Sequence, residues 1–178
     1  FEWISSGNFL ANWSINIDPL SSVMLVVVTL VSSIVHIYSI GYMSHDPHKP
    51  RFMSYLSLFT FSMLVLVVSD NFLQLFFGWE GVGLCSYLLI GFWYKRETAN
   101  NAAIKAFIVN RVGDFGLAVG IFLIFYYFGT INFIEVFELA PSFQDKNLLF
   151  FGFELSLITL ICLFLFVGAM GKSAQFLL

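Results

Sequence analysis

The strongest constraint on the fold is a series of long apolar segments separated by short polar turns. These segments lie at about 18–43, 52–69, 71–93, 99–128 and 148–171. A helix needs roughly 17 to 25 mostly apolar residues to cross a bilayer, and each segment provides that length. The period-two alternation of a membrane β-barrel strand is missing from all of them. The sequence therefore predicts an all-α integral membrane protein, a polytopic helical bundle of about five transmembrane helices.

Composition supports this class and argues against others. Only 11% of the 178 residues are charged and 59% are hydrophobic, whereas about 25% of residues are charged in a typical soluble domain. A net charge of −3 without a basic tract argues against nucleic acid as a partner. Cys85 and Cys162 lie in apolar segments without metal-ligand spacing, as small buried hydrophobic residues do. Since His36 is the only histidine at membrane depth, we expect no metal and no redox cofactor in this chain.

The pattern divides the chain into an extramembrane segment, residues 1–17, and a transmembrane bundle, residues 18–178. Apolar and polar residues alternate over 9–17, which predicts one short strand at the membrane surface. Asp18 followed by Pro19 is typical of a helix start, because Asp caps the first turn and Pro fits its first position.

The connections predict the order and sidedness of the helices. Only residues 69–71 join the second and third helices, which must therefore be antiparallel neighbours, with Asp70 as the N-cap of the third. Loops 44–51 and 94–98 carry basic residues, whereas the opposite side, which includes 129–147, is mainly acidic. By the positive-inside rule, the two basic loops face the cytoplasm or the mitochondrial matrix.

Glu80 lies in the middle of the apolar segment 71–93. At about 1.5 Å per residue it is roughly 14 Å into its helix, close to the membrane midplane. An ionisable residue at that depth is costly, and function is its default explanation. Gly83 and Gly91 share its helix face and permit close helix approach, so we expect this face to pack on protein.

A second group of charges lies in the segment 99–128. Arg111 and Asp114 are three residues apart, which places both on one helix face and allows them to pair. Gly113, Gly116 and Gly120 add small residues at three- and four-residue spacing beside them. This pattern predicts tight packing against another helix.

Lys172 follows Gly168 and Gly171 at the end of the last apolar segment, a pattern typical of a helix interrupted inside a membrane protein. One interpretation of the four intramembrane charges is a static ion-pair network that only fixes helix packing. The alternative is a functional array, which we favour because buried charges seldom add stability over apolar residues.

His36 forms a weakly polar seam on the first helix with Thr29 and Ser33, which lie seven and three residues before it. In the structural interpretation the hydroxyls bond to their own helix backbone and the histidine is simply satisfied. In the functional one His36 takes part in proton transfer.

Five blocks in chain order closely resemble subunit 5 of NADH:ubiquinone oxidoreductase, the respiratory complex I family. They lie at residues 18–20, 36–43, 70–93, 109–115 and 171–175. The resemblance implies an antiporter-like inverted-repeat fold, of which this chain is an incomplete, N-terminal portion or fragment. It also implies a proton-pumping role, in which Lys172 binds the proton and Glu80 controls it. Arg111 and Asp114 would then offer alternative partners to these two residues, so that the array is bistable.

Further expectations follow from the resemblance. FMN, iron–sulfur clusters and quinone belong to other subunits, and the partners are other membrane-arm subunits, the lipid membrane and, for a split subunit, a chain with the remaining helices. The 23 phenylalanines hint at an AT-rich organelle gene, which favours the mitochondrial inner membrane over a bacterial plasma membrane. Two other functions stay open: a subunit of a multisubunit Na⁺/H⁺ antiporter, and a non-pumping structural spacer.

Overall fold

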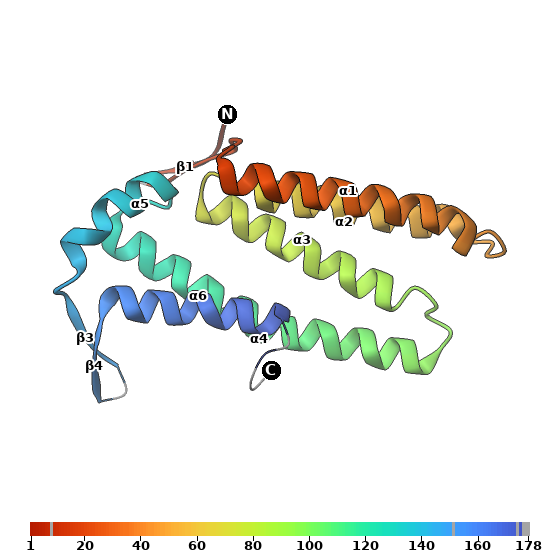
Figure 1. Cartoon of the computed structure of the whole chain (residues 1–178). Coiled ribbons are helices and arrows are strands. Elements are labelled where there is room, and N and C mark those ends of the chain that lie inside the picture. Colours follow the sequence, from red (N-terminus) through yellow and green to blue (C-terminus); the bar gives the residue numbers. More distant parts are fainter. Residues whose placement is uncertain (8, 151, 174, 176–178) are drawn as a thin grey trace. The chain divides into compact units, whose positions relative to one another are not determined.

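A computed structural model describes residues 1–7, 9–150, 152–173 and 175 (Figure 1). It confirms the helical membrane class. The chain forms two compact units, and the single bundle over 18–178 stays a prediction. The α1–α3 unit contains Ser14–Ser69 and Phe77–Ile108, and the α4–α6 unit contains Phe1–Trp13, Asp70–Phe76 and Val109–Leu178.

The α1–α3 unit contains α1 (Pro19–Tyr42), α2 (Lys49–Val67), most of α3 (Phe72–Ile90) and the first turns of α4 (Glu97–Phe128). The predicted start of α1 is confirmed. Asp18 accepts a hydrogen bond from the Ser21 backbone N–H at 2.6 Å, and the Ser21 hydroxyl oxygen accepts one from the Asp18 N–H at 2.7 Å. This reciprocal cap satisfies two amides that the first turn cannot satisfy by itself.

Helices α2 and α3 are antiparallel neighbours, as the short connection predicted. A Cβ atom on Gly78 would lie 2.7 Å from the Leu66 nitrogen, and one on Gly81 would lie 2.7 Å from the Ser62 hydroxyl. Contacts this short are possible only without a side chain, so these two glycines set the spacing of α2 and α3.

The two basic loops meet at one end of the α1–α3 unit. The Trp93 indole N–H donates to Asp46 at 3.0 Å, and Arg51 donates to the Phe92 carbonyl at 3.1 Å. The indole, followed by the His48 backbone N–H, lowers the pKa of the Asp46 carboxyl. Loops 44–51 and 94–98 therefore share a side of the unit, as predicted.

The N-cap of α3 is Asn71, and the prediction of Asp70 is wrong. The Asn71 side-chain oxygen accepts a hydrogen bond from the Gln74 backbone N–H at 2.8 Å, while its amide donates to the Asn12 carbonyl at 2.7 Å. Asp70 instead accepts from the side chain of Asn132 at 3.3 Å. An asparagine serves both contacts because its amide has a donor as well as an acceptor, whereas a carboxylate only accepts.

The N-terminal segment contains two strands where the alternation predicted one. β1 (Glu2–Ser6) pairs antiparallel with β2 (Phe9–Asn12), with Ser6 opposite Phe9. Gly7 turns the chain at a φ of 59°, a conformation that glycine adopts readily. The alternation continues past Asn12, but no regular strand does.

The predicted helix 148–171 is wrong in its first third. Residues in that region form a hairpin, β3 (Asn147–Phe150) with β4 (Phe153–Ser156), and α6 begins only at Leu157 and ends at Ser173. Gly152, at a φ of 85°, permits the tight turn, and the phenylalanines favour paired strands. Apolarity alone does not separate a strand from a helix over so short a run.

Among the described residues, four helices (α1 to α4) are long and apolar enough to span a membrane. The predicted fifth, α6, is an apolar helix of 17 residues and is shorter than these four. The long connection contains α5 (Phe133–Leu139) and a 3₁₀ turn at Ala140–Phe143.

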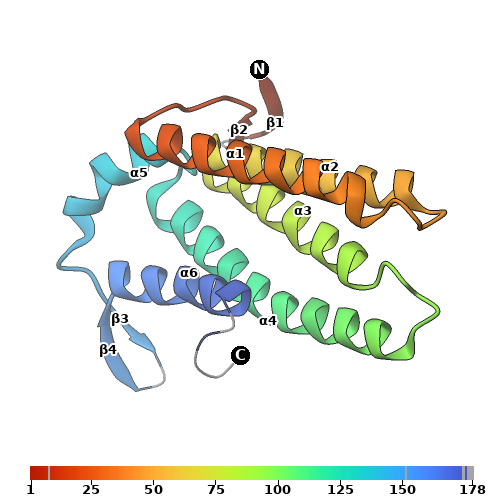
Figure 2. The same cartoon turned by 45° about the vertical axis from the view of Figure 1, so that its right-hand side comes forward.

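A small apolar core anchors α6 in the α4–α6 unit. Leu157 and Ile161 at its start pack with Ile124 of α4 and Val136 of α5, and all four are almost fully buried. Figure 2 shows α6 beside the second half of α4. This anchor sets how α6 continues along α4 toward the charged residues.

Candidate functional site

The candidate site begins with the close contact of α4 and α6. A Cβ atom on Gly113 would lie 3.0 Å from the Gly171 Cα, and one on Gly171 would lie 2.9 Å from the Gly113 Cα. One turn away, a Cβ on Gly168 would lie 2.8 Å from the Leu117 Cβ. The tight packing predicted for Gly113 is therefore confirmed, and its partners are the glycines that precede Lys172.

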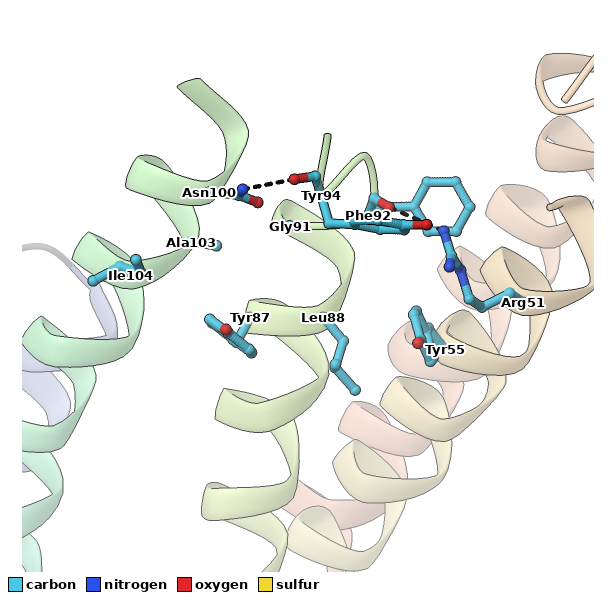
Figure 3. Close-up of a pocket in the computed structure, with 10 residues that line it drawn as sticks. All are labelled: Arg51, Tyr55, Tyr87, Leu88, Gly91, Phe92, Tyr94, Asn100, Ala103 and Ile104. Carbon is cyan, nitrogen blue, oxygen red and sulfur yellow. Dashed lines mark hydrogen bonds between the residues drawn. The ribbon is translucent and has the colours of Figure 1, made fainter. Parts of the chain in front are cut away.

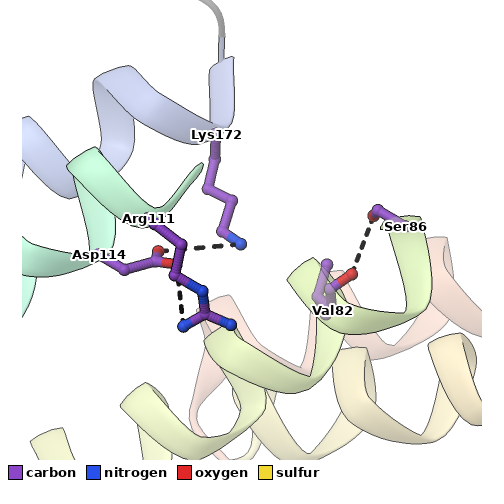
Figure 4. Close-up of polar contacts among 5 residues, drawn as sticks. All are labelled: Val82, Ser86, Arg111, Asp114 and Lys172. Carbon is purple, nitrogen blue, oxygen red and sulfur yellow. Dashed lines mark hydrogen bonds and ion pairs between the residues drawn. The ribbon is translucent and has the colours of Figure 1, made fainter. Parts of the chain in front are cut away.

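This contact brings three charges together. The Asp114 carboxylate lies 3.7 Å from an Arg111 guanidinium nitrogen and 3.9 Å from Lys172 Nζ (Figure 4). The predicted Arg111–Asp114 pair on one helix face is confirmed. The second cation comes from α6, 58 residues further along the chain than Asp114 (172 − 114).

Burial differs across the three charged side chains. Asp114 is 5% exposed and Lys172 is 18% exposed, whereas Arg111 is 42% exposed. The shared carboxylate is thus the least accessible member, and one of its two cations reaches the surface of the unit. A buried charge is tolerated only where opposite charges or hydrogen bonds compensate it, and Asp114 has a cation on each of two helices.

The distances indicate electrostatic contact rather than direct hydrogen bonding between these atoms. Direct hydrogen bonds between charged nitrogen and oxygen are about 2.7–2.9 Å long. Asp114 is therefore about 1 Å too far from either cation, and a small shift would join it directly to one of them. This arrangement can exchange partners, unlike a bidentate pair.

Glu80 lies in α3, is partly buried and belongs to the α1–α3 unit, whereas Lys172 belongs to the α4–α6 unit. The pairing of Glu80 with Lys172 stays a prediction. On the face of α3 that contains Glu80, Leu84 and Tyr87 are 46% and 36% exposed. The glycines of α3 that contact α2 are Gly78 and Gly81.

The hydroxyls of the polar seam bond to their own helix, as the structural interpretation expects, whereas a role of His36 in proton transfer stays a prediction. Thr29 and Ser33 donate to backbone carbonyls one turn earlier, at 2.7 Å each. The His36 ring contacts the Ser32 carbonyl at 2.8 Å through Nδ1 and the Ser57 hydroxyl of α2 at 3.2 Å through Nε2. The histidine therefore joins α1 to α2, a contact that spacing along α1 does not reveal.

Sequence reasoning also missed a polar cluster around Asn71, which is 3% exposed. Its backbone bridges to Asn132, and the Phe72 N–H donates to the Ile131 carbonyl at 3.0 Å. Asparagine beside a helix start is the available signal, because its side chain bonds readily to nearby backbone. Within the described parts of the chain, no group of three or more His, Cys, Asp or Glu residues is arranged to hold a metal ion.

Comparisons with known proteins agree with this architecture. Residues 69–178 match the family described as "NADH:quinone oxidoreductase/Mrp antiporter, TM", and residues 3–53 match "NADH-Ubiquinone oxidoreductase (complex I), chain 5 N-terminus".

Curated relatives include the NADH-ubiquinone oxidoreductase chain 5 of Chondrus crispus, 62% identical over 98% of this chain and 26% of its own length. The NADH-quinone oxidoreductase subunit L of Rickettsia bellii is 60% identical over 97% of this chain and 27% of its own. The chain thus spans about a quarter of the length of these relatives. It belongs to the NADH:quinone oxidoreductase/Mrp antiporter transmembrane family.

Proposed function

We propose that this chain is part of the proton-translocating membrane-arm subunit of NADH:ubiquinone oxidoreductase, respiratory complex I. Its family and the names of its relatives support this assignment. The observation that carries the mechanism is the position of Asp114 between Arg111 and Lys172 at the α4–α6 contact. In this proposal the chain contributes to an enzyme without holding a redox centre itself.

The three charges form a switch in which the carboxylate changes partner. When Asp114 moves toward Arg111, one negative charge is withdrawn from the Lys172 ammonium, and release of its proton from this buried environment becomes more favourable. When Asp114 returns, a proton on Lys172 is again stabilised. Because Arg111 keeps its charge throughout, it provides a permanent second partner for the carboxylate.

Glu80 supplies the controlling negative charge from α3. A second carboxylate that approaches the cluster would compete with Asp114 for the cations, and a carboxylate that withdraws would restore the first arrangement. Moving one elementary charge against 100 mV requires about 2.3 kcal/mol. Rearrangement of a buried ion pair involves energies of this size or larger, so a modest movement suffices.

The setting of this subunit follows from the same proposal. FMN, iron–sulfur clusters and quinone lie in other subunits, and the neighbours are other membrane-arm subunits and lipid. We place the protein in the mitochondrial inner membrane, with the bacterial plasma membrane as the alternative. If the remaining helices of the subunit belong to a separate polypeptide, that chain is an obligatory partner.

The test is NADH-driven proton translocation by the assembled complex reconstituted into vesicles, normalised to the amount of assembled protein. Asp114→Asn keeps the side-chain shape and removes its charge, and we expect proton uptake to fall by about tenfold or more. Asp145→Asn makes the same chemical change at an exposed position and should have no effect. Glu80→Gln should also lower translocation more than it lowers assembly.

Two results would contradict the proposal. Normal proton translocation by both the Asp114→Asn and Glu80→Gln variants would favour the structural spacer. The matching family also includes Mrp antiporters, so sodium-driven proton exchange in vesicles without NADH would favour the antiporter subunit.

A further inference from the structure

A pocket of about 430 Å³ opens at the basic end of the α1–α3 unit (Figure 3). Its walls come from the first turns of α2, the last turns of α3 with the loop that follows, and the first turns of α4. Arg51 contributes the charge, and Tyr55, Tyr87, Tyr94 and Asn100 contribute polar groups.

Arg51 is held in place with part of its hydrogen-bonding capacity unused. One guanidinium nitrogen donates to the Phe92 carbonyl at 3.1 Å. The guanidinium carbon lies 4.6 Å from the Phe92 ring centre and 5.4 Å from the Tyr94 ring centre. Its Nε is buried and has no hydrogen-bond partner among the described residues. A buried donor without an acceptor is costly, so an oxygen ligand at this atom would be stabilising.

The guanidinium favours one class of ligand. Its planar array of N–H donors matches the oxygens of a phosphate or carboxylate better than any neutral group. No carboxylate lines the described pocket. The nearby Asp46 already accepts hydrogen bonds from the Trp93 indole and the His48 N–H.

The surroundings place the pocket at the level of lipid headgroups. Tyrosine and tryptophan concentrate where a membrane meets water, because their rings are apolar with a polar edge. Three tyrosines line this pocket and Trp93 lies in the adjacent loop. On the side toward the helix interiors the lining includes Leu88 and Ile104 beside the rings of Tyr55 and Tyr87 (Figure 3), and Ile104 is 50% exposed. A ligand with a charged head and an apolar tail could place its head at Arg51 and its tail against Leu88 and Ile104.

We infer that this pocket binds the phosphate of an anionic phospholipid, with Arg51 as its principal contact. Lys49 and Arg96 lie in the adjoining turns and raise the local positive potential. Basic pockets between transmembrane helices are suited to anionic headgroups in the leaflet on the positive side. The inference concerns a site separate from Asp114 and Lys172 and does not rest on the proposed proton function.

The test compares the lipid bound by assembled, detergent-purified wild-type protein with that bound by an Arg51→Gln variant. After delipidation, each protein is titrated with phosphatidylglycerol in phosphatidylcholine nanodiscs, and bound lipid is counted by native mass spectrometry. We expect the affinity for phosphatidylglycerol to fall by about tenfold in Arg51→Gln. Lys95→Gln is the matched control, because it removes a cation from the adjacent loop without changing the pocket lining, and it should retain near-normal affinity.

Two further variants separate a binding defect from misfolding. Arg51→Lys keeps the charge and should retain part of the binding. Ile104→Trp fills the apolar side of the pocket without touching Arg51 and should also weaken binding. Equal lipid retention by wild type, Arg51→Gln and Ile104→Trp would overturn the inference. Competition by millimolar inorganic phosphate would show that the ligand is a free anion and not a lipid. A protein carboxylate found against Arg51 in the assembled complex would show that a partner subunit fills the pocket.

Discussion

The α1–α2 pair and the α4–α6 pair are both helix contacts within a membrane protein, yet they are built from different chemistry. Hydroxyls and an imidazole join α1 to α2, through Ser32 with Thr60 at 2.7 Å and His36 with Ser57 at 3.2 Å. Glycines and three charges join α4 to α6. Only 6% of the apolar 18-residue stretch of α1 is buried, compared with 39% of the corresponding stretch of α4.

This difference indicates how well each helix pair tolerates substitutions at its contact. Hydroxyl contacts between membrane helices are individually weak, because hydroxyls also find partners on their own helix, as Thr60 does with Leu56 at 3.0 Å. A glycine contact has no such freedom, since the atom across it is backbone. The charged group requires that close approach, so packing and chemistry depend on each other in the α4–α6 pair and are separable in the α1–α2 pair.

Removal of the shared carboxylate should have the largest effect. Asp114→Leu leaves Lys172 and Arg111 without their common partner, and we expect a loss of about 3–5 kcal/mol in unfolding free energy. The amount of assembled protein and its thermal midpoint in detergent are the measurements. The double variant Asp114→Leu with Lys172→Met should recover most of the stability but no proton translocation. A double variant as unstable as the single would show that charge compensation is not what Asp114 supplies.

Gly113→Ala should have the second largest effect. The added methyl would meet the Gly171 backbone at 3.0 Å, where nothing can move aside without shifting α6, and we expect a cost of about 1–3 kcal/mol. Gly41→Ala in α1 is the matched control, because a Cβ there meets nothing within 4 Å. Its higher helix propensity should make it neutral or slightly stabilising. Equal thermal midpoints for the two variants would remove the contrast between the helix pairs.

The hydroxyl contact of the α1–α2 pair should contribute much less to the free energy of unfolding. A double-mutant cycle with Ser32→Ala and Thr60→Val isolates the coupling between the two side chains, and about 0.6 kcal/mol is expected. Unfolding in graded denaturant or detergent mixtures measures it. A coupling energy above 2 kcal/mol would place this contact in the same class as the α4–α6 contact.

The smallest effect concerns the cap of α1 and depends on pH. Hydrogen bonds from Ser21 to the Asp18 carboxylate lower its pKa below the usual 3.8. A carboxyl group with a lowered pKa stabilises the fold while it is ionised, so the cap should be intact at neutral pH. Its contribution should be lost as the pH falls below about 3.8 and through the lowered pKa.

Hydrogen exchange of the Ser21 and Ser22 amides, corrected for intrinsic rates, reports the state of this cap. Asp18→Asn keeps a side-chain acceptor and does not titrate, so its corrected protection should not change with pH. The same acid-dependent loss of protection in both proteins would assign the effect to other groups.

Local spacing predicted two interactions correctly, and in each of them the partners lie three residues apart. Arg111 and Asp114 pair because a separation of three residues places both on one helix face. The reciprocal cap of Asp18 likewise joins residues three apart. The prediction failed at Asp70, because the choice of Asn71 depends on Asn12, 59 residues away. It failed over 148–156 because an apolar run of that length suits a strand as well as a helix.

The sequence by itself therefore determined a helical membrane protein, the start of α1, the antiparallel α2 and α3 and the positions of the intramembrane charges. Each depends on apolar length, on capping or on spacing within a few residues. Only the tertiary structure decided that Lys172 is the second partner of Asp114, that His36 reaches Ser57 and that Arg51 lines a pocket. These contacts join separate helices, so they depend on how the helices pack, as where Gly113 and Gly171 let α4 and α6 approach closely.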